Sequence, residues 1–176
     1  MRPGSVDPLT AIGTAVGEPD PSVVRSIVEV CGRTDRARAV PRIRVLAARL
    51  PAPEGDQLAV HLGRRARRLL VAVWAAGGEP VFLDGAARLV GGVPPALGPE
   101  VGAVLRRRRD QPLAAWIAAA GAVGSELDDV VVVLGALVES LIDDLAAALG
   151  VERTVVEEAT WSAPHPVAPR CDGPTG

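Results

Sequence analysis

The feature that most constrains the fold is the segment from residue 126 to residue 149, which lacks proline and repeats its apolar residues every three or four positions. That spacing puts apolar side chains on one side of a helix. Four consecutive valines at 130–133 favour a strand by propensity, but the spacing that follows them outweighs it. We therefore predict a helix over 126–149, with Ser125 as its N-cap and Gly150 behind it. Its later apolar residues are Leu134, Leu137, Val138, Leu141, Ile142, Leu145 and Leu149.

Proline, aspartate and glycine divide the rest of the chain into further helical segments. Asp7-Pro8 and Asp20-Pro21 pair an N-cap with a proline at the first helical position, and no alternation of period two is sustained. We predict an all-α, single-domain bundle of about six to eight helices over 7–161. Residues 1–6 and the Pro-rich tail 162–176 are expected to be disordered. The remaining helices are expected at 7–17, 20–32, 34–50 with a restart at Pro41, 56–76, 80–90, 99–109, 112–121 and 152–161, with a brief strand at residues 81–83 as the alternative to the helix at 80–90.

Composition bears on the source and the compartment of the protein. All nineteen basic residues are arginine, and the chain contains neither asparagine nor tyrosine, which indicates the G+C-rich codons of a bacterium. Two distant cysteines, Cys31 and Cys171, are expected to be free thiols in a reducing compartment. The N-terminus lacks the apolar core of a signal peptide, and no apolar stretch reaches the ~20 residues of a membrane span. We expect a cytoplasmic protein without membrane contacts.

The charges separate into two poles along the chain. Residues 25–68 contain eleven arginines and four acids, a net charge of +7, whereas residues 125–160 contain nine acids and one arginine, a net charge of −8. Such asymmetry concerns association more than fold. The poles are expected either to face each other inside one molecule or to pair between molecules.

Arginines gather around a histidine on the helix expected at 56–76. His61, Arg64, Arg65 and Arg68 share a stripe opposite Leu58, Leu62, Ala66, Leu69 and Val73, so we expect a basic outer face. This face would be solvated, or would hold a phosphate or an acidic partner helix. His61 followed by Arg64 also resembles the phosphoacceptor helix of histidine phosphotransfer domains, although those usually carry Lys-Gly where this chain has Arg64-Arg65.

Two further charged groups are candidate binding residues. Arg106, Arg107, Arg108 and Arg109 stand at a helix end, where cations are favourable, and their functional interpretation is a nucleic-acid patch. The acidic side chains Asp128, Asp129, Glu139 and Asp143 lie opposite the apolar stripe of 126–149. Metal sites in bundles need Glu-x-x-His motifs and inward carboxylates, so we expect no metal here.

The segment from Leu145 to Val156 resembles a helix-turn-helix, with Ala146, Gly150 and Val156 at its small, turn and core positions. Its second helix would carry Glu152, Glu157 and Glu158 against Arg153 alone, which repels phosphate. We therefore expect this shape to serve packing.

Recognised catalytic arrangements are missing from the sequence, which has no Gly-rich phosphate loop, no G-x-S-x-G and no Cys-x-x-Cys. We expect no catalytic residue, no enzyme and no cofactor. The leading hypothesis is a regulatory or accessory module that binds another protein or itself through its charged faces, with specific nucleic acid not expected as a partner. The alternative is a small DNA-binding regulator that uses about 141–160.

Overall fold

The computed structural model describes residues 7–15, 17–50, 55–107, 110–121 and 125–162. Within these ranges the chain forms eight α-helices and one 3₁₀ helix, and no strand. The predicted all-α fold is therefore confirmed. In chain order the elements are α1 (Pro8–Ala11), α2 (Pro21–Arg33), α3 (Arg36–Ala47), α4 (Gly55–Ala75), η1 (Ala86–Leu89), α5 (Leu97–Leu105), α6 (Asp110–Gly121), α7 (Ser125–Leu149) and α8 (Arg153–Trp161).

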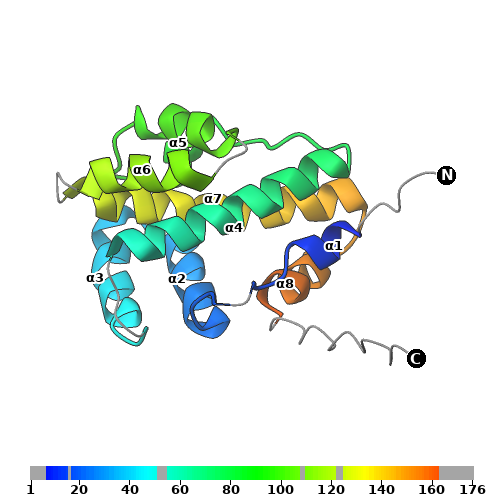
Figure 1. Ribbon diagram of the computed structural model, residues 1–176, viewed down its shortest axis with the longest axis horizontal. Helices are drawn as coiled ribbons and strands as arrows, with labels where there is room; N and C mark the ends of the chain where they lie inside the picture. The colour runs from blue at the N-terminus through cyan, green and yellow to red at the C-terminus, as the bar shows by residue number, and fades with distance from the viewer. Residues whose placement is uncertain (1–6, 16, 51–54, 108–109, 122–124, 163–176) are drawn as a thin grey trace, which may run out of the picture.

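Helix α7 is the centre of the bundle. Every residue from Val130 to Val138 is buried, and nine consecutive residues make more than two helical turns, so neighbours surround this part of α7 on all sides. In Figure 1, α4 crosses in front of α7, α5 and α6 lie above it, and the remaining helices lie below. The expectation of one buried stripe on this helix was too narrow, because seven other elements, six helices and η1, pack against it.

Aspartate caps fix the starts of the early helices as the sequence predicts. The carboxylates of Asp7 and Asp20 accept hydrogen bonds from the backbone N–H groups of Leu9 and Ser22, at 3.1 and 2.9 Å. Asp35 does the same for Arg38 at 3.0 Å. Each bond satisfies a donor that has no partner inside its helix.

Some predicted boundaries were wrong. Helix α3 runs through Pro41 without a restart, because the proline removes only one N–H and lies on the exposed side of the helix. Residues 80–90 form turns and the short η1, since Asp144 of α7 accepts the backbone N–H of Val81 at 3.1 Å and holds this segment against the bundle. Helix α1 ends at Ala11 and does not reach Gly17.

The expected disorder of 1–6 and of the tail from 163 onward lies outside the described residues. Ser162, which we assigned to the tail, belongs to the ordered part, because its carbonyl accepts the N–H of Thr14 at 3.3 Å.

Helices α2 and α7 approach closely at a glycine. A Cβ atom built on Gly135 would lie 2.6 Å from Sγ and 2.8 Å from Cβ of Cys31. Cys31 is fully buried there, and burial raises the pKa of its thiol to about 12. The thiol is therefore a small packing group at neutral pH. Cys171 lies outside the described residues.

Candidate functional site: the arginine cluster of α4

The arginine cluster consists of Arg64, Arg65, Arg67 and Arg68 on α4 together with Glu18, which precedes α2. The predicted apolar side of α4 is confirmed, since Leu58, Leu62, Ala66, Leu69 and Val73 are all buried. The predicted solvated outer face is wrong in part. Helices α1 and α8 cover one edge of it, so the cluster has a buried half and an open half.

Arg65 forms the buried half and is only 2% exposed. Its guanidinium pairs with the Glu18 carboxylate at 2.8 Å and donates to the carbonyl of Thr160, at the end of α8. It also lies over the indole of Trp161, 4.6 Å from the ring centroid. Burial lowers the pKa of Arg65 to about 10, although Glu18 acts in the opposite direction, so the group stays protonated at neutral pH.

The burial of Arg65 could have been inferred from its spacing along the helix, although a charged residue is usually expected at the surface. Arg65 lies seven residues after Leu58, four before Leu69 and seven before Ala72, so it belongs to the apolar stripe by spacing. Its partners gave no such sign, because Glu18 and Thr160 are 47 and 95 residues away in the chain.

Arg64, Arg67 and Arg68 form the open half of the cluster. They line a hollow of about 370 Å³ together with Ala11 and Val71. Arg68 pairs with the second oxygen of Glu18 at 2.6 Å, so one carboxylate serves two guanidinium groups. Arg67 donates to the carbonyls of Val104 and Leu105 at 3.2 and 3.4 Å.

The electrostatics of the cluster favour an anion. Four arginines and one glutamate give it a net formal charge of +3. His61, one turn before Arg64, lies half-buried at its edge. Burial and the charges of Arg64, Arg65 and Arg68 lower the pKa of His61 against the opposing effect of Glu18. His61 is therefore mainly neutral at neutral pH. Its Nδ1 is buried without a hydrogen-bond partner, so the structure adds no further feature to the resemblance between His61 and a phosphoacceptor histidine.

The second arginine group is only partly described. Helix α5 ends at Leu105, and Arg106 pairs with both carboxylate oxygens of Asp84 at 2.5 and 2.7 Å. That hydrogen bonding lowers the pKa of Asp84. Arg107 is exposed, and Arg108 and Arg109 lie outside the described residues.

The acidic side chains of α7 lie opposite its apolar stripe by spacing, but only Asp143 is largely exposed, and the other three are covered by arginine partners. Asp129 is buried and pairs with Arg36, while Asp128 pairs with Arg44 of the same helix α3 at 2.6 Å. The two charge poles therefore face each other within one molecule. This resolves the alternative that the sequence left open for these pairs.

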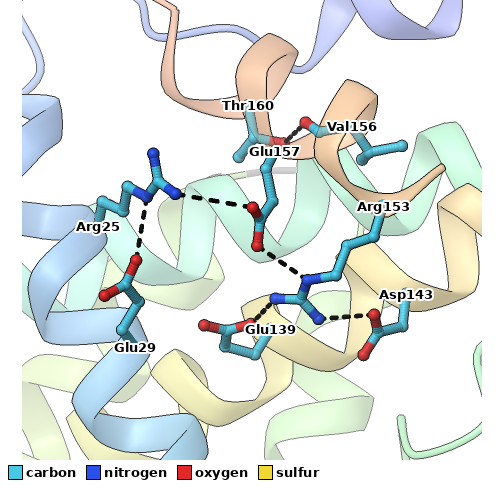
Figure 2. Close-up of polar contacts among 8 residues, drawn as sticks. All are labelled: Arg25, Glu29, Glu139, Asp143, Arg153, Val156, Glu157 and Thr160. Atoms are coloured by element: carbon cyan, nitrogen blue, oxygen red, sulfur yellow. Dashed lines mark hydrogen bonds and ion pairs between the residues drawn. The ribbon is translucent and has the colours of Figure 1, made fainter.

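Glu139 and Asp143, farther along α7, both pair with Arg153 of α8, as Figure 2 shows. Glu157 completes a set of three carboxylates around this arginine and also pairs with Arg25 of α2. Burial alone lowers the pKa of Arg153, but the hydrogen bonds to these carboxylates reverse the effect and raise it above the ordinary value. The network ties α2, α7 and α8 together.

The segment that resembles a helix-turn-helix has the expected local shape. Helix α7 ends at Leu149, Gly150 adopts a φ of 66°, and α8 follows with Val156 buried. A left-handed turn of this kind suits glycine. However, the arginine of the would-be reading helix is already bound by three carboxylates of its own chain.

Neither a metal site nor a membrane-spanning helix occurs among the described residues. No group of three His, Cys, Asp or Glu side chains in them is placed to hold a metal ion. None of the helices there combines the length and apolar character that crossing a membrane requires.

Comparison with known proteins adds no relative. No family model, no curated protein and no solved structure matches this chain.

Proposed function

We propose that the protein is a binding module for an acidic segment of another protein, and that the open half of the arginine cluster is the site. The observation that carries the proposal is the hollow lined by three guanidinium groups on α4, in a cluster of net charge +3. Guanidinium groups bind carboxylates through charge-assisted hydrogen bonds. As part of this proposal the protein is cytoplasmic and bacterial, with a regulatory or accessory role.

Two features of the charge distribution support a protein partner over the alternatives. Arg36 and Arg44 of the basic pole pair with acids of α7 within one chain, so these parts of the two poles already match each other in a single copy. The DNA-regulator alternative needs Arg153 at a phosphate, whereas Arg153 holds Glu139, Asp143 and Glu157. If Arg153 moved to a phosphate, these three carboxylates would lose their positive partner and would be repelled by the phosphates of the DNA.

The test measures binding of a fluorescent, glutamate-rich peptide to the intact chain. The variant Arg64→Gln/Arg67→Gln is compared with Arg42→Gln/Arg49→Gln, which removes the same charge from exposed positions on or next to α3. We expect the first pair to weaken binding about three- to tenfold and the second less than about twofold. Melting curves of both variants check that the fold is retained.

An equal loss in both variants would contradict the proposal, because the peptide would then respond only to net charge. So would tight, sequence-dependent binding to duplex DNA that survives ~150 mM salt. Arg65 is excluded from the variants, although the sequence alone places it on the outer face, because it is buried against Glu18 and its loss would change stability as well as charge.

A further inference from the structure

Bulky apolar side chains are exposed next to the arginine hollow. Of the seven large hydrophobic residues that are exposed within the described part of the chain, four fall between residues 71 and 82. They belong to the last turns of α4 and the turn segment after it. Soluble proteins scatter such residues singly, so a concentration of them marks an interaction surface. The four are Val71, Trp74, Val81 and Phe82.

The apolar residues continue the arginine hollow along one face of α4. Val71 itself lines that hollow, and it is 54% exposed. Trp74, three residues later on the same side of the helix, is 43% exposed and lines a second hollow of about 310 Å³ with Val81. Arg64, Arg67, Arg68, Val71 and Trp74 thus form one stripe, which we call the α4 stripe. In Figure 1, α4 lies on the near side of the molecule.

The spacing of the α4 stripe defines the ligand. From Arg67 to Trp74 there are seven residues, or two helical turns, which is about 10 Å along the axis. The stripe presents about one side chain per turn, which is the pattern that a second helix meets when it packs alongside. The two ends differ in charge, since the second hollow is lined by Glu79 and by the paired Asp84 and Arg106, whereas the charged residues of the first are all arginines.

We infer that the α4 stripe binds an amphipathic helix of a partner protein, with carboxylates at one end of its contact face and a bulky apolar residue two turns away. This deepens the proposed function and rests on it. The carboxylates meet Arg64, Arg67 and Arg68, and the apolar residue covers Trp74 and Val81. The chain's own residues 163–176 contain a single acidic side chain, Asp172, and so do not supply two acidic side chains one helical turn apart.

The test uses three synthetic helical peptides of the same length and net charge. The first carries two glutamates one turn apart and a leucine two turns beyond them on the same face. The second has the leucine on the opposite face, and the third has alanine in place of the leucine. Binding to the full chain is followed by fluorescence anisotropy, and light scattering of the free chain reports self-association.

We expect the first peptide to bind at least about tenfold more tightly than the other two, because the free energy gained by burying one leucine side chain is enough for a difference of that size. Val81→Ser, at a residue that is 70% exposed, should remove most of that advantage without affecting the other peptides. Val45→Ser is the matched control, because Val45 is 64% exposed on the distant α3. Trp74→Ala should act like Val81→Ser.

The outcomes separate this inference from the proposed function. Equal binding of the three peptides, still weakened by Arg64→Gln/Arg67→Gln, would overturn the helix inference and leave the acidic-segment function standing. Binding that ignores those arginines would overturn both. The inference would also be overturned if light scattering shows a stable dimer that becomes a monomer on Val81→Ser. In that case the ligand of the α4 stripe would be a second copy of the chain.

Discussion

The pair of Glu18 and Arg65 gives the sharpest stability prediction. The Glu18 side chain is 7% exposed, and the change Glu18→Gln removes its charge while keeping its size. Removing one partner of a buried ion pair typically costs ~3–5 kcal/mol, because the other charge stays buried without compensation. Arg65 keeps its bond to the Thr160 carbonyl and its contact with Trp161, so the loss should fall at the lower end, about 3 kcal/mol.

A loss of that size is large compared with the total stability of a single domain. For a chain of this length it corresponds to a drop of about 6–12 °C in melting temperature. Urea unfolding followed by far-UV circular dichroism measures it directly, with the m-value as a check that the unfolding remains cooperative. Glu158→Gln is the matched control, since Glu158 is exposed at the surface of α8.

A second variant separates the buried charge from simple packing. In Glu18→Gln/Arg65→Met no charge of the pair remains, and methionine fills much of the space beside Trp161. This double variant should be more stable than Glu18→Gln alone, by about 1 kcal/mol or more. If Glu18→Gln lowers the free energy of unfolding by less than about 0.5 kcal/mol, Arg65 is not a buried charge that depends on Glu18. The same follows if the double variant is clearly less stable than Glu18→Gln alone.

Three further predictions concern packing, pH and the core. Gly135→Ala should destabilise the fold by about 1–3 kcal/mol, because its Cβ would overlap the α2 thiol, whereas Gly91→Ala, whose nearest contact would be 3.7 Å, should be close to neutral in the same urea assay. The lowered pKa of His61 means that the unfolded chain binds more protons just below pH 6.5, so stability should fall as the pH drops through that window. His61→Gln should remove this part of the pH dependence, and an unchanged profile would refute it. Leu137→Asp should abolish cooperative unfolding, since it buries an unpaired charge, while Asp143→Asn, whose side chain is 60% exposed, should cost less than about 1 kcal/mol.

Local features of this fold could be predicted from the sequence. The caps at Asp7 and Asp20 depend on residues two positions away, and the helix that Gly150 follows depends on regular apolar spacing. Both are therefore visible to pattern reasoning. The charge asymmetry between the two poles could also be predicted, because it follows from counting charged residues in each segment of the sequence.

What the sequence could not supply is the set of contacts between distant segments. Helical spacing puts Asp129 opposite the apolar stripe of 126–149, yet α3 brings Arg36 to it from 93 residues away and buries it. The sequence puts Arg65 on the outer stripe by its spacing from His61, although its spacing from Leu58, Leu69 and Ala72 also matches the apolar stripe. The α4 stripe depends on which face α1 and α5 leave uncovered, and no local pattern contains that information.

The most direct test of the central claim is a nitrogen–proton NMR titration of the chain with the first helical peptide. Each tryptophan indole N–H gives its own signal, and Trp74 is exposed whereas Trp116 and Trp161 lie partly buried against the core. The account predicts that the Trp74 indole and the guanidinium Nε–H signals of Arg64 and Arg67 shift together, at one saturating peptide concentration. Shifts centred on the arginines of α3 or on Arg153, with the Trp74 signal unmoved, would contradict it.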